Sequence, residues 1–124
     1  MIMRHDDCIF CKIANGEIPS ATIYEDDDFR AFLDLNPATR GHALLVPKDH
    51  FANLLELDEE HAEKAILLAK KIGSRMKEKL GCDGLNLVQN NGEAAGQTVF
   101  HFHMHLIPRY KDDHAGILWE PGKT

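Results

Sequence analysis

Three histidines alternate with apolar residues near the carboxyl end of this chain, where residues 100–106 are Phe-His-Phe-His-Met-His-Leu. Successive side chains of a strand point to opposite faces, so the pattern predicts one apolar core face and one face carrying His101, His103 and His105. Imidazole can act as a nucleophile, a proton carrier or a metal ligand near neutral pH. A plain solvated face is the alternative, and strict alternation of three histidines disfavours it.

The spacing of these histidines indicates that some serve catalysis and others bind a structural metal. His101 and His105 would lie about 13 Å apart at Cα on a strand, whereas zinc holds each nitrogen at about 2.1 Å, so three ligands from this strand could share one metal only with difficulty. Cys8 and Cys11 form a Cys-x-x-Cys pair. With His50 and His101 they would complete a tetrahedral structural zinc site. Reduced thiols or a redox pair remain alternatives, and Cys82 is expected in the core.

Composition narrows the class of protein. The 124 residues suit one domain, residues 1–124, and the formal net charge of -6 disfavours binding to nucleic acid. The first residues contain no apolar signal region, and no run approaches the roughly 18 apolar residues of a membrane span. Three cysteines disfavour a secreted disulfide framework. We therefore expect a cytoplasmic protein that binds a small ligand and no membrane.

Capping and periodicity place the elements that would position these side chains. A short helix over residues 8–14 is expected, capped by Asp6 or Asp7 and ended by Asn15 and Gly16. A long helix should begin after Asp58 and end at Gly81, with Ala62, Ala65, Ile66, Ala69, Ile72, Met76 and Leu80 at helical spacing.

Strand-forming residues fill most of the remaining chain. A hairpin is expected from residues 21–24 and 29–35, and a buried strand over 42–46 stops at Pro47. Strands at 85–88 and 99–107 would flank a loop over 90–96. Short turns between strands, with one long helix, predict an α+β fold with an antiparallel sheet covered by helix on one face.

Residues 101–107, His-Phe-His-Met-His-Leu-Ile, resemble the signature of the histidine triad (HIT) family. The resemblance extends over residues 8–13, 32–37, 41–42, 46–48, 96–98 and 119–122, and together these segments are similar to the Hint branch, the nucleoside phosphoramidases. It implies a HIT fold, in which a five-stranded antiparallel sheet carries one long and one short helix. It also implies a homodimer in which two sheets join into ten strands.

The resemblance further assigns roles to individual residues. His103 would be the nucleophile, and His101, His105 and His42 would complete the catalytic set. Asp34 would bind the ribose, beside an apolar base slot of Ile9, Phe10, Ile13, Phe32, Leu35 and Leu44. Asn90, Gln97, Thr98 and His105 would contact the phosphate. The zinc ligands would be Cys8, Cys11, His50 and His101, as in many bacterial and archaeal members.

Some of these positions also have simpler interpretations. Any one of the apolar residues could serve core packing alone, and residues 90–96 could be an ordinary turn. Leu33 stands where eukaryotic members often carry histidine, and Thr98 replaces a common serine. Both departures could alter substrate preference, although neither removes a catalytic group.

The expected activity is hydrolysis of the P–N bond in purine nucleoside phosphoramidates, through a nucleotidyl-histidine intermediate. One rival is cleavage of dinucleoside polyphosphates, as in the Fhit branch. Residues 119–122, Trp-Glu-Pro-Gly, look more like Hint, in which the tail reaches the partner's site. A second rival is a non-catalytic module that binds a nucleotide and contacts another protein.

Overall fold

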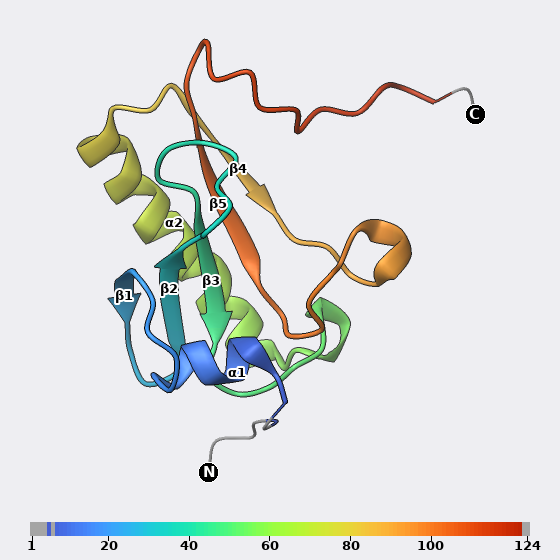
Figure 1. Cartoon of the computed structure of the whole chain (residues 1–124). Helices are drawn as coiled ribbons and strands as arrows, with labels where there is room; N and C mark the ends of the chain where they lie inside the picture. Colours follow the sequence, from blue (N-terminus) through green and yellow to red (C-terminus); the bar gives the residue numbers. More distant parts are fainter. Residues whose placement is uncertain (1–4, 6, 123–124) are drawn as a thin grey trace.

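Five strands form an antiparallel sheet in the computed structural model, which describes residue 5 and residues 7–122 (Figure 1). Their order across the sheet is β1-β2-β3-β5-β4. The strands are β1 Thr22–Glu25, β2 Phe29–Leu33, β3 Ala43–Pro47, β4 Gly84–Val88 and β5 Met104–Arg109. The helices are α1 Ile9–Ala14 and α2 Glu59–Leu80, with 3-10 turns η1 Leu54–Glu56 and η2 Glu93–Ala95. The α+β class and the five-stranded antiparallel sheet are confirmed.

The two helices cover opposite faces of the sheet, and the strands alternate between them. Phe32, Leu44 and Val46 pack with Phe10 and Ile13 of α1. The neighbouring positions on the same strands instead join α2 in the larger core cluster, which includes Phe29, Ala31, Ala43 and Leu45. This period of two explains why β3 is buried along its whole length. The sheet therefore has a face under α1 and a face under α2.

Helix α2 begins and ends at the predicted residues. The Asp58 side chain accepts the backbone N–H of His61, and Gly81 ends the helix in the left-handed conformation. Ala65, Ala69, Ile72 and Met76 are buried as the periodicity predicted. Ile66 differs, because it lies on a flank of the helix that no described residue covers and is 56% exposed.

The Asp58 cap should have a measurable effect on stability. Replacing Asp58 with alanine leaves the His61 N–H without its side-chain acceptor, and we expect the free energy of unfolding to fall by about 1 kcal/mol. Urea denaturation followed by circular dichroism measures this change. The matched control is Asp27→Ala, another exposed aspartate, which should change stability by less than about 0.5 kcal/mol. Equal effects of the two substitutions would show that the cap contributes nothing.

The hairpin of β1 and β2 forms as predicted, although β2 is shorter than expected. Asp26 Oδ1 accepts the N–H groups of Asp28 and Phe29, which builds the acidic turn. At the other end, Asp34 Oδ1 accepts the N–H of Asn36. This local bond turns the chain, so β2 ends at Leu33 instead of residue 35.

The strand predicted over residues 99–107 begins later, at Met104. Its pairing with β3 ends at Leu45 opposite Met104. Continuing that register would bring Phe102 opposite Pro47, which has no N–H to donate to a ladder. The Phe102 N–H instead bonds to the carbonyl of Phe51, and Phe100 is 51% exposed. The predicted strand is therefore wrong for residues 99–103, and the predicted core position is wrong for Phe100. Phe102 and Leu106 are fully buried in the core under α2, with Met104 packed against it, as predicted.

Helix α1 differs from the prediction at its start. Its N-cap is Cys8, whose Sγ accepts the N–H of Cys11, and not Asp7; Asp6 lies outside the described residues. The helix ends at Asn15, followed by Gly16 with φ of 80°, as predicted. Cys82 is buried, also as predicted. Over the described residues, neither helix has the length and apolar content that a bilayer crossing requires.

Candidate active site and metal site

A cavity of about 410 Å³ lies on the α1 side of the sheet. Its walls come from α1 and the connector after it, from β2 and the turn that follows, from β3, and from β5 with the segment before it. Eleven of the twelve predicted nucleotide-binding residues line it: Ile9, Phe10, Ile13, Phe32, Asp34, Leu35, Leu44, Asn90, Thr98, His103 and His105. Apolar side chains dominate, with one carboxylate, one amide, one hydroxyl and two imidazoles among these residues. Such a lining suits an apolar ring joined to a polar, anionic group.

The His103 imidazole is oriented by the backbone. Its Nδ1–H donates to the carbonyl of His101 at 2.8 Å, and Phe10 packs edge-on against the ring with the ring centroids 5.0 Å apart. Burial lowers the pKa of His103, which more than offsets the opposing effect of the carbonyl bond. The ring is therefore neutral at pH 7. Because Nδ1 carries the proton, Nε2 keeps its lone pair, which is the condition for a nucleophile.

His105 and His42 form a second hydrogen-bonded chain behind the cavity. The backbone N–H of Ala38 donates to His42 Nδ1 at 2.9 Å, so Nε2 of the neutral His42 ring must carry the proton. That Nε2 lies 2.9 Å from His105 Nδ1 and donates to it. Burial, followed by the nearby His103 and His42 rings, lowers the pKa of His105 to about 4. Neutral His105 then carries its proton on Nε2, on a ring that lines the cavity.

Asp34 lies beside this chain, with Oδ2 3.6 Å from His42 Nε2. Asp34, His42 and His105 offer three potential metal ligands within 4.8 Å of one another. The hydrogen bonds oppose a metal here, because His42 Nε2 carries a proton and has no lone pair to give. We therefore interpret this group as a proton-carrying network with a carboxylate at the cavity edge.

A second cluster of side chains lies beside the start of α1 and consists of Cys8, Cys11, His50 and His101. Their ligand atoms all lie within 4.8 Å of one another, and Cys11 Sγ is 3.3 Å from His50 Nδ1 and 3.4 Å from His101 Nδ1. Zn–S bonds of about 2.3 Å and Zn–N bonds of about 2.0 Å at tetrahedral angles would separate sulfur from nitrogen by roughly 3.5 Å. The donor set and its spacing fit zinc.

The second nitrogen of His101 supports the same interpretation. Nε2–H donates to the carbonyl of Pro47 at 2.8 Å, and burial lowers the pKa of His101 to about 4, so Nδ1 presents a lone pair to the two sulfurs. His50 has a pKa lowered by burial and by the nearby His5, whose ring stacks on it. A structural zinc site uses neutral imidazoles and cysteines, and the two cysteines would bind zinc as thiolates.

His101 also connects the two sites. Its ring belongs to the cysteine cluster, while its carbonyl holds His103. It does not line the cavity, so its predicted catalytic role would be exerted through the backbone. His42 likewise lies behind His105 and does not line the cavity.

Gln97 is placed differently from the other predicted phosphate contacts. It is 3% exposed and does not line the cavity. Its Oε1 accepts the N–H of Gly92, and its Nε2 donates to the carbonyls of Ala52 and Val99. The amide thus braces the loop that carries Asn90 and Thr98.

Sequence reasoning missed several lining residues: Ile18, Pro19, Ser20, Ala21, Leu33, Asn36, Gly96 and Val99. Residues 18–21 connect α1 to β1, and nothing in their composition distinguishes them from an ordinary linker. Two predicted residues lie at the rim instead of in a closed slot, since Leu35 is 94% and Ile9 52% exposed.

The arrangement has counterparts in known proteins. The family model described as the HIT domain matches residues 15–112. The chain is 47% identical to "Protein hit" of Bacillus subtilis over 93% of this chain and 80% of the relative, and 43% identical to the adenosine 5′-monophosphoramidase HNT1 of Saccharomyces cerevisiae over 94% and 72%. A Zn-bound histidine triad family protein from Mycobacterium smegmatis superposes with a TM-score of 0.85 at 38% identity, over 94% of this chain and 84% of that one. This chain belongs to the HIT family.

Proposed function

We propose that this chain is a nucleotide hydrolase that cleaves the P–N bond of purine nucleoside phosphoramidates, in which AMP is joined to an amine such as a lysine side chain. The observation that carries the proposal is the bond from His103 Nδ1 to the His101 carbonyl, which leaves the Nε2 lone pair on a ring that lines the cavity. The 43% identical yeast relative is named for activity on an adenosine phosphoramidate.

The cavity residues suggest how the nucleotide would lie. The purine would occupy the apolar part between Phe10, Ile13 and Phe32, and Asp34 would accept hydrogen bonds from the ribose hydroxyls. Asn90, Thr98 and His105 would then contact the phosphate oxygens. Positioned donors supply much of the stabilisation in phosphoryl transfer. Gln97 would act indirectly, by bracing the loop.

The reaction would proceed in two displacements. His103 Nε2 would form a bond to the α-phosphorus as the P–N bond breaks, and the amine nitrogen would keep the bonding pair and take a proton from solvent. Neutral His105 would donate a hydrogen bond through its Nε2–H and keep that proton. Water would then attack the phosphorus and lose a proton to solvent as the bond from phosphorus to His103 breaks, which releases the nucleoside monophosphate and restores the His103 ring.

Zinc would be held by Cys8, Cys11, His50 and His101. When bound, zinc would supply a structural cross-link between the start of α1, the loop after β3 and the segment before β5. The cluster residues themselves already hold His101, whose carbonyl orients His103.

We also propose that the chain forms a homodimer through β4 and the uncovered flank of α2. Strand β4 lies at the edge of the sheet, with no partner strand on its outer side among the described residues. Leu85 and Leu87 on β4, with Ile66 and Leu67 on α2, are 37–56% exposed. In a two-fold symmetric dimer, β4 of one protomer would pair with β4 of its partner, and the two sheets would form one continuous sheet. This pairing would bury the unpaired edge and the exposed apolar residues beside it. Leu118 and Trp119 of the tail are 88% and 84% exposed, so they could contribute to such an interface.

If the dimer forms through β4, a charge introduced on this strand should prevent dimerisation. We expect Leu87→Glu to shift the chain from dimer to monomer, because a carboxylate buried at the interface would lose its hydration without a partner. Sedimentation velocity measures the mass in solution. The control Leu55→Glu changes another exposed leucine on η1 and should leave the mass unchanged. A monomeric wild type, or a Leu87→Glu variant that remains dimeric, would contradict this interface.

The proposed substrate class is tested by relative turnover. We expect kcat/KM for adenosine 5′-phosphoramidate to exceed that for a diadenosine polyphosphate by at least about tenfold, measured by release of AMP. The reverse order would favour the Fhit-like activity. Nucleotide binding without turnover of either compound would favour the non-catalytic module, for which the cavity alone is sufficient.

A further inference from the structure

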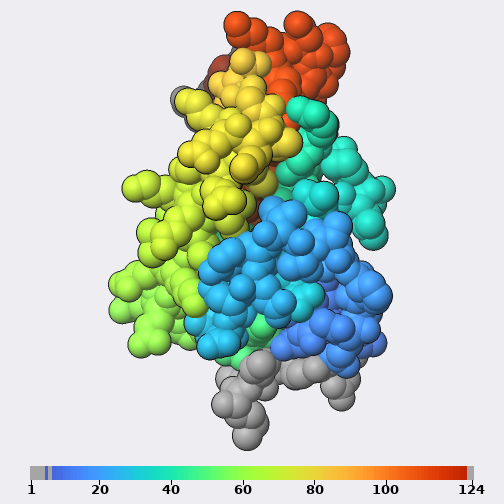
Figure 2. Space-filling view, turned by 90° about the vertical axis from the view of Figure 1, so that its left-hand side faces the viewer, coloured from blue at the N-terminus to red at the C-terminus, as the bar shows by residue number. Residues whose placement is uncertain are grey.

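A second, larger hollow lies on the α2 side of the sheet and meets the active-site cavity at Leu33. It has a volume of about 920 Å³ and runs between α2 and the β1–β2 hairpin. Figure 2 shows the surface hollowed where the yellow-green helix meets the blue hairpin. Its floor is apolar and includes Leu68, Ile72 and Met76 from α2, with Ile23 and Leu33 from the hairpin. Ile23 and Leu33 remain 46% and 38% exposed, so the groove presents apolar surface to solvent.

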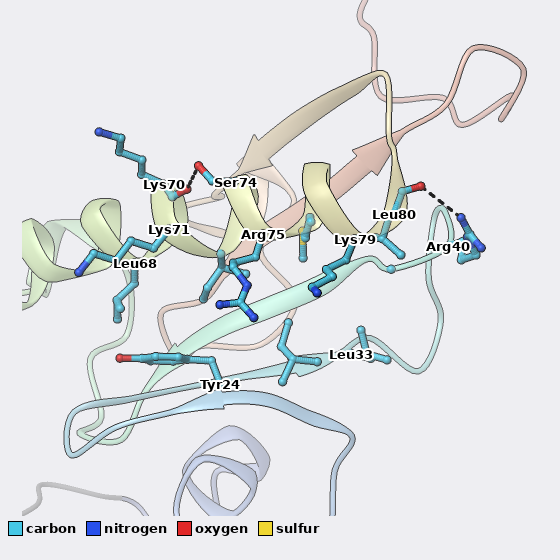
Figure 3. Close-up of a pocket in the computed structure, with 14 residues that line it drawn as sticks. Tyr24, Leu33, Arg40, Leu68, Lys70, Lys71, Ser74, Arg75, Lys79 and Leu80 are labelled. Carbon is cyan, nitrogen blue, oxygen red and sulfur yellow. Dashed lines mark hydrogen bonds between the residues drawn. The ribbon is translucent and has the colours of Figure 1, made fainter.

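Cations follow one side of this groove. Lys71, Arg75 and Lys79 are exposed, occur at intervals of four residues on α2 and line the groove. Figure 3 shows the Arg75 and Lys79 side chains extending from the helix toward the hairpin. Within the described chain none of the three makes an ion pair, and no acidic residue lines the groove. This is notable in a chain with a net charge of -6.

The spacing of the cations identifies the kind of occupant. Four helical residues rise about 6 Å, so the three charges extend along roughly 12 Å beside a continuous apolar floor. A fatty acid has one charged end and would leave two cations unmatched. An amphipathic helix with acidic residues four apart would match all three cations and place its apolar face on the floor.

We propose that this groove binds an acidic amphipathic helix of a partner protein. Ile23 and Leu33 contact its apolar face above the buried floor, while Lys71, Arg75 and Lys79 pair with its carboxylates. Among the described residues Leu33 lines both the groove and the active-site cavity, and the other residues that line the cavity lie outside the groove. Binding weakens as ionic strength rises, because the pairs are exposed to solvent.

The probe is a labelled synthetic peptide about four helical turns long, with leucines along one face and glutamates four residues apart beside them. A second, basic peptide has the same sequence with lysine in place of every glutamate. Fluorescence anisotropy with the full chain at low salt gives the affinity. We expect the acidic peptide to bind and the basic peptide to bind at least about tenfold more weakly. Arg75→Glu with Lys79→Glu should weaken binding of the acidic peptide at least about tenfold.

The matched control is Lys77→Glu with Lys111→Glu, which changes the net charge equally at exposed positions outside the groove and should retain wild-type affinity. Turnover of the phosphoramidate and the thermal unfolding midpoint verify that both double variants are folded. The proposal is overturned if the acidic peptide fails to bind, if both peptides bind equally, or if both double variants weaken binding equally. Binding of laurate in the groove without binding of the acidic peptide would assign it to small amphiphiles instead.

Discussion

Replacing His103 with asparagine is expected to lower kcat for adenosine 5′-phosphoramidate by roughly 10⁴-fold or more, while the affinity for AMP changes only a few-fold. Asparagine retains an N–H that can donate to the His101 carbonyl, so the local structure is preserved. It has no lone pair that can attack phosphorus. The apolar wall of the cavity and Asp34, which would hold the nucleotide, are unchanged.

The matched control for this substitution is His114→Asn. His114 is exposed in the tail with φ of 57°, a conformation that asparagine tolerates, and it does not line the cavity. Intact-protein mass spectrometry after rapid acid-free quenching should detect one added nucleoside monophosphate on the wild type and on His114→Asn, and none on His103→Asn. Near wild-type turnover by the purified His103 variant, with contaminating hydrolase excluded, would show that the nucleophile is another residue.

Removing one cysteine of the metal cluster should have the second large effect. We expect Cys11→Ala to lose bound zinc and to reduce the free energy of unfolding by roughly 3 kcal/mol or more, because a metal that binds only the folded state stabilises it. Cys11 is fully buried, and its Sγ lies beside both imidazoles. Elemental analysis of protein loaded with one equivalent of zinc, followed by urea denaturation, measures both quantities.

Cys82→Ala is the control for the metal cluster. Cys82 is also buried, so the substitution removes the same thiol from a packed position, but it lies outside the four-residue cluster. It should retain one equivalent of zinc. If the wild type takes up no zinc, or if Cys11→Ala retains a full equivalent, the cluster would be better interpreted as reduced thiols that hydrogen-bond to His50 and His101.

Local patterns predicted those features of the fold that depend on nearby residues. The Asp58 cap, the Gly81 stop and the acidic turn at Asp26 are each made by side chains or backbone within a few positions, so their sequence signals were reliable. The course of residues 99–103 was not predicted correctly. It depends on Pro47 and Phe51, which lie about 50 positions earlier and cannot be linked to this segment by periodicity.

The candidate site divides in the same way. Residue types and the family resemblance selected eleven of the side chains that line the cavity, but they could not distinguish Gln97 from Asn90. Both side chains are amides in one loop. Only the fold shows that the Gln97 amide forms its hydrogen bonds with backbone groups of Gly92, Ala52 and Val99. The connector over residues 18–21 was missed because these residues line the cavity only by lying close to it in the fold. Lining a cavity in this way requires no particular residue type, so the amino-acid composition gives no signal.

The sequence by itself determined the α+β class, the long helix, the three alternating histidines and the set of two cysteines and two histidines that could bind zinc. The tertiary structure alone decided which nitrogen of each ring carries a proton. That choice depends on the carbonyls of Pro47 and His101 and on the N–H of Ala38, backbone groups that every sequence possesses. These backbone groups reach their positions beside the imidazoles only once the strands have paired. For this reason the sequence identifies His103 as the candidate nucleophile but does not show which of its two nitrogens faces the substrate.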